Sequence, residues 1–258
     1  MTQPTDDDVN KLNKRLTWQR ENSSRGLTFV PLDTEGPLRL VVFTDSSFVN
    51  NRDYSSQIGY VIVLADEKNN ANIIYWSSTK CKRVTRSTLA SELYGLATGL
   101  DVEAAIKATL EKIMKVESLP LTLCTDSRSL YECLVKLGTT YEKRLMIDIM
   151  CLRQSYERRE ISEVVWIDED SNPADAMTKV GPCQALRDLV DINRIDLRVT
   201  GWVERDQEGG TTGTGNTGKQ SPKTRSSQCV TPCVSPANTL IACPRSGCAS
   251  SSNMSLPA

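Results

Sequence analysis

The chain contains no histidine among its 258 residues. This absence excludes Ser-His and Cys-His nucleophilic catalysis, and every zinc site that needs an imidazole ligand. No stretch approaches the roughly 18 consecutive apolar residues that would span a membrane. The N-terminal sequence MTQPTDDDVNKLNKR is polar and acidic, so no secretory signal peptide is expected.

Charge is not in excess in either sign. Lys and Arg number 31, Asp and Glu number 32, and the formal net charge is -1. Overall charge therefore gives no reason to expect nucleic-acid binding, and an argument for it has to come from local clusters. The nine cysteines are an odd count without a secretion signal. This pattern favours reduced thiols and a cytoplasmic location.

Composition divides the chain into three segments. Residues 1–37 are polar, with a weak helical pattern. Residues 38–205 carry the apolar runs and predict one folded domain. From residue 206 to residue 258 the sequence turns to Gly, Ser, Thr and Pro with few large apolar side chains. Such a segment cannot bury enough surface to offset its ordering entropy, so we expect a disordered low-complexity tail.

The apolar periodicity within the folded segment predicts an α/β domain with the order βββ-α-β-α-α-β-α. Short β-type runs occupy 38–44, 57–66, 72–78, 119–125 and 163–168. Helical patterns follow Ser87, end near Gly138, and span 141–159. The stretch SNPADAMTK predicts a last helix, with Asn172 as its N-cap and Pro173 at its first position.

Two apolar strands end at an aspartate that is followed by serine. Asp45 lies in VVFTDSSF, and Asp126 lies in LTLCTDSRSL. If the two strands are parallel neighbours, both carboxylates emerge at the same edge of the sheet. Close carboxylates repel each other unless a cation neutralises them, and hard oxygen ligands suit Mg²⁺ or Mn²⁺. The alternative is that each aspartate is an ordinary turn or cap residue.

Two further acids lie at matching points of the predicted topology. Glu92 lies in the second turn of the helix after the third strand, and Asp175 lies near the start of the last helix. Taken singly, Glu92 reads as a solvated helix residue and Asp175 as a complement to a helix dipole. The argument for a metal site therefore depends on all four acids occurring together.

Four motifs give the chain a resemblance to a known family. VVFTDSSF, WSSTKCKRVTRSTLASELYGL, LCTDSRSLYECL and WIDEDSNPADAMTK resemble the ribonuclease H domain of copia-type (Ty/copia-like) retrotransposon polyproteins. The resemblance covers roughly residues 38–180. The preceding segment looks like the connector that follows the reverse transcriptase in such polyproteins, which marks the chain as a polyprotein fragment.

The resemblance implies a ribonuclease H-like fold, with a five-stranded mixed sheet flanked by helices. It also implies metal-dependent endonucleolytic cleavage of the RNA strand of RNA/DNA hybrids. Asp45, Glu92, Asp126 and Asp175 would be the catalytic residues and would hold two Mg²⁺ or Mn²⁺ ions about 4 Å apart. Asp45 would bridge the two ions, Glu92 and Asp126 would complete one coordination sphere, and Asp175 would complete the other.

The same resemblance implies partners and a location. The partners are an RNA/DNA hybrid and the reverse transcriptase domain of the parent polyprotein, with no membrane. The location is the cytoplasm, including virus-like particles. Integrases share the superfamily fold but place their glutamate last, whereas here it is second in the order, which favours ribonuclease H.

The sequence departs from the family pattern at two places. Val165 lies in the neighbourhood where cellular ribonucleases H carry a mobile histidine. Met146 replaces a histidine found in many copia-type members, while the nearby Asp148 remains, and we interpret Asp148 as a helix-surface or structural residue and not as a ligand. The loss of the mobile histidine bears on the turnover rate more than on the chemistry.

Basic and hydroxyl residues next to the acids are candidates for nucleic-acid binding. The candidates are Lys80, Lys82, Arg83, Arg86, Ser46 and Ser127. Cations and hydroxyls at the mouth of a carboxylate site are what a phosphate backbone needs. The alternative is an ordinary solvated charge run.

Two functional alternatives remain open from the sequence. The first is a catalytically inactive ribonuclease H-like connector or nucleic-acid-binding module, motivated by the missing histidine and the missing polymerase. The second is a strand-transfer nuclease of the same superfamily, which would cut duplex DNA and ignore hybrids.

Overall fold

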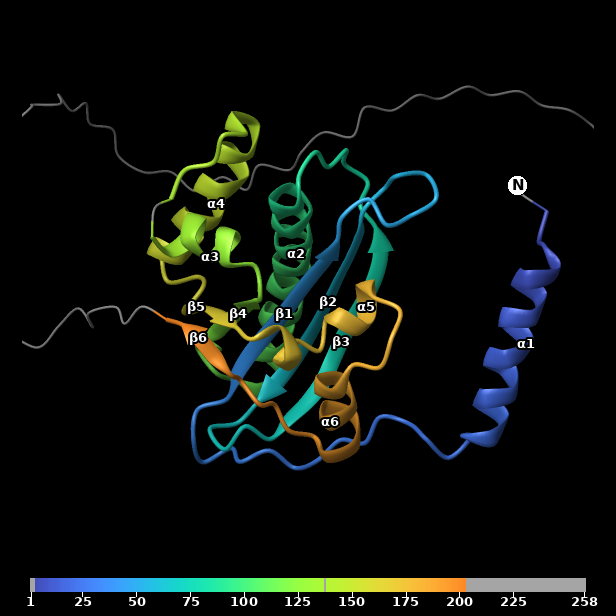
Figure 1. The fold of residues 1–258 in the computed structure, drawn as a ribbon. Coiled ribbons are helices and arrows are strands. Elements are labelled where there is room, and N and C mark those ends of the chain that lie inside the picture. The colour runs from blue at the N-terminus through green and yellow to red at the C-terminus, as the bar shows by residue number, and fades with distance from the viewer. Residues whose placement is uncertain (1–2, 137, 203–258) are drawn as a thin grey trace, which may run out of the picture. The chain divides into compact units, whose positions relative to one another are not determined.

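The computed structural model describes residues 3–136 and 138–202 (Figure 1). The predicted tail, together with Leu137, lies outside the described residues. The predicted strands are present, and their bounds are β1 Arg39–Ser47, β2 Gln57–Ala65, β3 Ala71–Lys80, β4 Leu121–Thr125 and β5 Glu163–Ile167. A short strand that the sequence did not predict, β6 Val199–Gly201, pairs with β5.

The sheet is mixed, as expected, and its strand order is β3-β2-β1-β4-β5-β6. β1 pairs antiparallel with β2, and β2 pairs antiparallel with β3. β1 also pairs in parallel with β4, and β4 pairs in parallel with β5. The predicted α/β class, the mixed sheet and the order of the five predicted strands along the chain are therefore confirmed, and β6 makes the described sheet six-stranded. β6 was missed because its three residues are mostly exposed and carry no apolar pattern.

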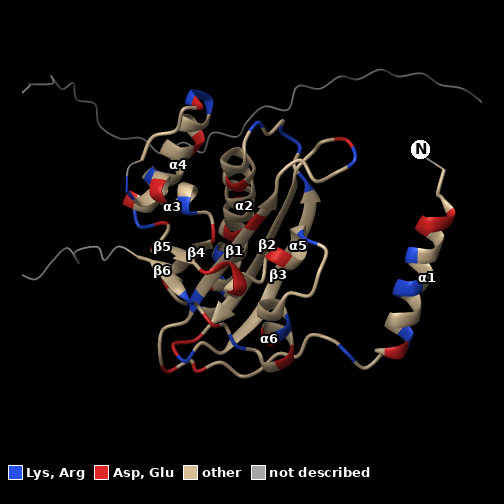
Figure 2. Cartoon of the chain, in the orientation of Figure 1, with Lys and Arg blue, Asp and Glu red and all other residues tan. Residues whose placement is uncertain are grey.

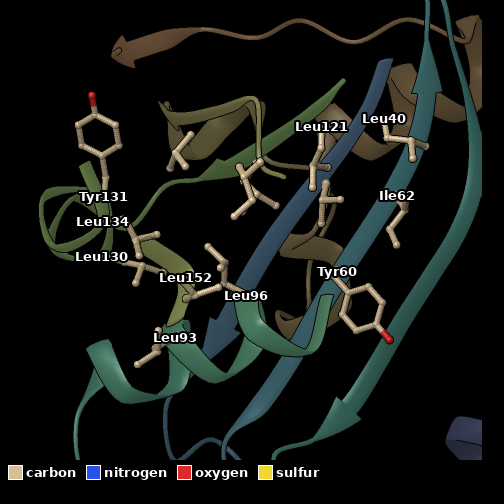
Figure 3. Close-up of a cluster of buried hydrophobic side chains, with 14 of the residues drawn as sticks. Leu40, Tyr60, Ile62, Leu93, Leu96, Leu121, Leu130, Tyr131, Leu134 and Leu152 are labelled. Carbon is tan, nitrogen blue, oxygen red and sulfur yellow. The ribbon is translucent and has the colours of Figure 1, made fainter. Parts of the chain in front are cut away.

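β1 is buried on both faces because it lies in the middle of the sheet. Leu40 and Val42 belong to one hydrophobic cluster, and Val41 and Phe43 belong to another. Alternate side chains of a strand point to opposite faces, so the two clusters fill the two sides of the sheet. Figure 3 shows the first cluster, in which side chains of the sheet and of the helices pack together.

Helices cover both faces of the sheet (Figure 1). One face carries α2 Thr88–Met114, α3 Arg128–Val135 and α4 Met146–Glu157, whose apolar residues pack in the first cluster. The opposite face carries α5 Asp175–Thr178 and α6 Gln184–Ile192. The predicted cap of α2 is confirmed, since the Ser87 side chain accepts a hydrogen bond from the backbone N–H of Ala90.

The last predicted helix differs from expectation. The 3-10 turn Glu169–Ser171 comes first, and α5 begins only at Asp175 and lasts a single turn. Asn172 is therefore not an N-cap, and Pro173 is not the first helical residue. Asn172 Oδ1 does accept a hydrogen bond from the Ala174 N–H at 3.1 Å, but Asn172 Nδ2 bonds across the sheet to Thr44 and Asp126, which holds this residue outside a regular helix. α4 likewise begins later than predicted, after a separate 3-10 turn Lys143–Leu145.

The segment before β1 contains the helix α1 Asp6–Glu21, where the sequence showed a weak helical pattern. Thr5 and Asp8 form a capping box at its start, and none of its residues is buried. Further along, the backbone N–H of Val30 donates to Asn72 Oδ1 at 2.9 Å, and the Asp33 N–H donates to Asp66 Oδ2 at 3.2 Å. Part of the predicted connector is thus hydrogen-bonded to the sheet. None of the described helices combines the length and the apolar character needed to cross a membrane.

Candidate metal centre

Three of the predicted acids come together at the C-terminal ends of the central strands β1 and β4. Asp45 belongs to β1, Asp126 directly follows β4, and Glu92 lies on α2. Thr44 and Thr125 are paired in the parallel β1–β4 ladder, so the aspartates after them leave the sheet side by side. One carboxylate oxygen of each of Asp45, Glu92 and Asp126 lies within 4.8 Å of the others. Three carboxylate oxygens are therefore close enough together to bind one cation.

Glu92 is buried, as is Asp45, which is 3% exposed. Glu92 is 5% exposed, and its Oε2 has no hydrogen-bond partner in the described part of the chain. Leaving a buried carboxylate oxygen unpaired is costly, so its presence needs a physical reason. Ser46 holds the helix beside it, since the Ser46 hydroxyl donates to Ser91 Oγ at 2.8 Å. Ser46, which was predicted to contact nucleic acid, is itself buried, and its hydroxyl is bonded to α2.

Asp126 is oriented from the neighbouring segment. Asn172 Nδ2 donates to Asp126 Oδ2 at 3.2 Å and also to the Thr44 carbonyl oxygen at 3.0 Å. The indole N–H of Trp166 donates to the Asp126 carbonyl oxygen at 3.1 Å. Ser127, which was predicted to contact nucleic acid, caps α3 by accepting from the Leu130 N–H. One asparagine thus ties the ends of β1 and β4 together.

The fourth predicted acid, Asp175, approaches the cluster through Lys179. Lys179 Nζ lies 2.9 Å from Asp175 Oδ2 and 4.0 Å from Asp45 Oδ1. Asp175 Oδ1 is buried and has no hydrogen-bond partner in the described part of the chain. The neighbouring Thr178 hydroxyl donates to Asp45 Oδ2. The turn of α5 therefore holds both a carboxylate and an ammonium group beside Asp45.

Burial makes these acids hard to ionise. It raises the pKa of Asp45 to about 6, the Thr178 hydrogen bond acts against this, and the charges of Asp126 and Asp175 raise it further. Burial also raises the pKa of Glu92 well above its usual range, and the charges of Asp45 and Asp126 add to the effect. Burial raises the pKa values of Asp126 and Asp175 as well. A cation at the cluster would offset all of these costs.

Lys179 supplies one positive charge to this region. Burial lowers the pKa of its ammonium, but hydrogen bonds to Asp175 and Glu169, with the charge of Asp45, outweigh burial and raise it. The Lys179 ammonium therefore stays charged at neutral pH.

The three-acid cluster offers only oxygen atoms as ligands, and one of them, Glu92 Oε2, has no hydrogen-bond partner in the described part of the chain. Such a set of donors fits a hard divalent cation such as Mg²⁺ or Mn²⁺.

Gly59 allows α5 to lie against the sheet at this point. It is paired with Asp45 in the β1–β2 ladder. A Cβ atom on Gly59 would overlap Met177 Cβ and would lie 2.9 Å from Thr178 Cγ2. Only glycine leaves room for the turn that carries Thr178 and Lys179.

Replacing Gly59 by alanine should displace this turn and disturb the metal centre. We expect a loss of about 1–3 kcal/mol in the free energy of unfolding, the usual cost of overpacking, and a lower affinity for divalent ions. Urea unfolding and Mn²⁺ titration measure the two effects. Gly26→Ala is the control, because no atom lies within 4 Å of the Cβ it would add. Equal behaviour of the two variants would contradict the role of Gly59.

The four predicted basic residues cluster around the segment between β3 and α2 (Figure 2). Lys80 forms an ion pair with Asp53 at 2.9 Å. Arg83 pairs with Asp148 at 3.2 Å, and its guanidinium lies 4.8 Å from the centre of the Tyr94 ring. Asp148, which we interpreted as a helix-surface or structural residue and not as a metal ligand, is thus the partner of Arg83. Lys82 and Arg86 are exposed.

The order of the strands along the chain matches the one predicted from the sequence, and their pairing defines the fold. β3-β2-β1 is an antiparallel meander, β4 and β5 extend it in parallel, and α2 crosses between the two halves. The fold is ribonuclease H-like. Similar solved structures include ribonuclease H1 of Halobacterium salinarum, at 17% identity and a TM-score of 0.42 over 58% of this chain and 98% of that one. Another is the prototype foamy virus ribonuclease H domain, at 17% identity and a TM-score of 0.34 over 63% of this chain and 95% of that one.

This ribonuclease H-like domain also has distant similarity to retrotransposon polyproteins. It is 26% identical over 182 residues to the Transposon Ty1-JR1 Gag-Pol polyprotein of Saccharomyces cerevisiae, covering 69% of this chain and 9% of that polyprotein. The truncated Ty1-A Gag-Pol polyprotein gives the same identity, with 14% of its length covered. The chain therefore spans only a small part of these curated relatives. It matches none of the known protein-family profiles.

Sequence reasoning missed several residues of the ribonuclease H-like site. Asn172, Thr178 and Lys179 all lie in the motif SNPADAMTK, from which only Asp175 was predicted as a ligand and Asn172 was predicted as a helix cap. Their polar side chains beside a candidate ligand were the signal that could have drawn notice. Gly59 gave no such signal, because its importance depends on the strand pairing and on the position of α5.

Proposed function

We propose that this domain is a divalent-metal-dependent ribonuclease H that cleaves the RNA strand of RNA/DNA hybrids, as part of a retrotransposon reverse transcriptase/ribonuclease H polyprotein. The observation that carries the proposal is the cluster of Asp45, Glu92 and Asp126, with ligand oxygens within 4.8 Å of one another. The buried, unpaired Glu92 Oε2 supports a cation as the missing partner. The motif resemblance and the Ty1 similarity supply the substrate class and the polyprotein context.

Asp45, Glu92 and Asp126 would hold one Mg²⁺ or Mn²⁺ ion, and Asp175 with Asp45 would hold a second. Such ions lower the pKa of an attacking water and stabilise the leaving 3′ oxygen. The chain supplies the orientation. The Thr178 hydroxyl fixes one oxygen of Asp45, and Asn172 fixes one oxygen of Asp126. Because these donors are built into the fold, the carboxylates need little rearrangement when an ion enters.

The hybrid would lie across the mouth of this site, next to the segment between β3 and α2. Lys82 and Arg86 are exposed there. Lys80 and Arg83 would exchange carboxylate partners for phosphate groups, which is feasible because exposed ion pairs contribute little stability. Contacts to the backbone and to 2′-hydroxyls need no base recognition, as a nuclease without sequence preference requires.

The direct test is cleavage of a hybrid whose RNA strand carries the label. The purified chain should release RNA fragments with Mg²⁺ or Mn²⁺ and none with EDTA. Asp126→Asn is the inactive comparison, and Asp101→Asn is the matched control, because Asp101 is an exposed acid on α2. Cleavage by the original chain no faster than by Asp126→Asn would overturn the proposal. Cutting of duplex DNA in place of hybrids would favour a strand-transfer nuclease.

One observation favours a second candidate function, an inactive ribonuclease H-like binding module. Lys179 already places a positive charge among Asp45, Asp175 and Glu169, where a metal would otherwise be needed. Tight, salt-sensitive hybrid binding without metal-dependent cutting in the same assay would support this module.

Removing Lys82 and Arg86 together should weaken hybrid binding about equally for different base sequences. Each lost phosphate contact should reduce the slope of log affinity against log salt by about 1. Fluorescence anisotropy in EDTA at several salt concentrations measures both quantities. Lys112→Ala, at the other end of α2, should change neither. An unchanged salt slope in the double variant would show that these residues do not contact phosphate.

A further inference from the structure

Lys179 bridges the three-acid cluster and the fourth acid. Its Nζ lies 2.9 Å from Asp175 Oδ2, 3.0 Å from Glu169 Oε1 and 4.0 Å from Asp45 Oδ1. Asp45 is shared between this lysine and the cluster with Glu92 and Asp126. The ammonium group therefore occupies the side of the site at which a cation shared by Asp45 and Asp175 would bind.

The fold holds the lysine at this place. The Lys179 N–H donates to the Asp175 carbonyl oxygen at 2.8 Å, which fixes the backbone at the end of α5. The preceding residue, Thr178, bonds to Asp45 and packs against Gly59. Beside the ammonium, Asp175 Oδ1 remains buried and without a hydrogen-bond partner among the described residues. A ligand atom for a second ion is thus available next to the lysine.

We propose that the Lys179 ammonium is a built-in cation on the Asp45–Asp175 side of the site. One divalent ion then binds first at Asp45, Glu92 and Asp126, and a second binds only by displacing the lysine. The inference rests on the proposed metal-dependent function and specifies how that function is controlled. An ammonium and a divalent ion repel each other at contact distance, so the two cannot share Asp175 and Asp45.

An open cavity beside the site can take up the Lys179 side chain when it is displaced. The Lys179 side chain is 41% exposed, and that of Glu169 is 72% exposed. Both residues line this cavity, which has a volume of about 580 Å³. A flexible four-carbon stem allows the ammonium to stay on Glu169 while it leaves Asp45 and Asp175. Because the Glu169 contact is kept in both positions of the lysine, displacement costs only the contacts to Asp45 and Asp175, while the Glu169 charge itself attracts a second ion.

Mn²⁺ titration followed by electron paramagnetic resonance tests the inference by counting bound ions without any substrate. The original chain should bind one Mn²⁺ tightly and a second at least about tenfold more weakly, the order expected for one neighbouring like charge. Lys179→Gln should tighten the second site at least about tenfold and leave the first within about threefold. Glu169→Gln should weaken the second site further, because it removes a negative charge that acts on the Asp175 side of the site.

Lys68→Gln is the matched control, because Lys68 forms an exposed ion pair with Asp33 outside the site. Circular dichroism verifies that each variant is folded. Equal affinity of both sites in the original chain, or an unchanged second site in Lys179→Gln, would overturn the proposed role of Lys179 and leave the proposed metal-dependent function standing. If Mn²⁺ binding is absent, or is insensitive to Asp126→Asn, the metal site itself fails, and the proposed function fails with it.

Discussion

Replacing Asp45 by asparagine is expected to lower metal-dependent cleavage of hybrids by at least about a thousandfold while making the metal-free protein more stable at pH 7. Asp45 is the acid that faces both proposed ions, and metal ligation is worth several kcal/mol of barrier, which is a thousandfold or more in rate. A variant that loses activity because it unfolds would lose stability as well. Opposite signs for activity and stability therefore separate a functional acid from a structural one.

The gain in stability follows from the pKa of Asp45. Burial raises this pKa from 3.8 to about 6. At pH 7 the ionised carboxylate therefore has a higher free energy in the folded protein than in the unfolded chain. One pKa unit is worth 1.36 kcal/mol, and the neutral asparagine should recover about 1–3 kcal/mol of unfolding free energy at pH 7. Its side chain can still accept the Thr178 hydrogen bond.

Urea unfolding in EDTA measures this gain, and the labelled hybrid measures the loss of activity. Asp101→Asn is the matched control, since this exposed acid lies on α2 outside the cluster. It should change neither quantity by much. An Asp45→Asn protein that cleaves hybrids at more than a tenth of the original rate would show that Asp45 is not a ligand of a catalytic ion.

The second large effect is on pH. In EDTA, the unfolding free energy of the original chain should fall relative to that of Asp45→Asn as the pH rises from about 4 to about 6. The reason is that the folded-state pKa of Asp45, about 6, lies above the value of 3.8 for the free side chain. Between these values the folded state binds the extra proton, so stability falls with rising pH at up to about 1.4 kcal/mol per unit. Above pH 6 the difference should stay constant.

Divalent ions should reverse this penalty, because they bind the ionised carboxylates. Saturating Mg²⁺ at pH 7.5 is expected to stabilise the original chain, and the effect should fade as the pH drops below about 6. Thermal unfolding with and without Mg²⁺ at several pH values measures it. Equal stabilisation at pH 5 and pH 7.5, or equal stabilisation of Asp45→Asn, would indicate that Mg²⁺ binds elsewhere.

The sequence predicted the parts of this fold that rest on regular patterns. β1 and β2 are long apolar runs in the middle of the sheet, and α2 carries a leucine stripe after a clear serine cap. Because Asp45 and Asp126 end apolar strands, their convergence followed once those strands were taken as parallel neighbours. The position of Glu92 on α2 then completed the cluster.

Other parts depend on contacts that no local pattern encodes. Asn172 resembles a helix cap in sequence, but its amide is used to join Thr44 and Asp126. The lysine that separates Asp175 from the cluster lies four residues further along, and only the turn of α5 brings its ammonium back to Asp45. Gly59 matters because of strand register and helix approach, both of which are tertiary features.

The central claim is that Asp45, Glu92 and Asp126 together bind a divalent ion. The most direct measurement is anomalous X-ray scattering from a crystal of the domain grown with Mn²⁺. We predict an anomalous peak at the end of β1 and β4, within coordination distance of an oxygen of all three acids. The absence of a peak there at saturating Mn²⁺, or a peak only at other acids, would contradict the account.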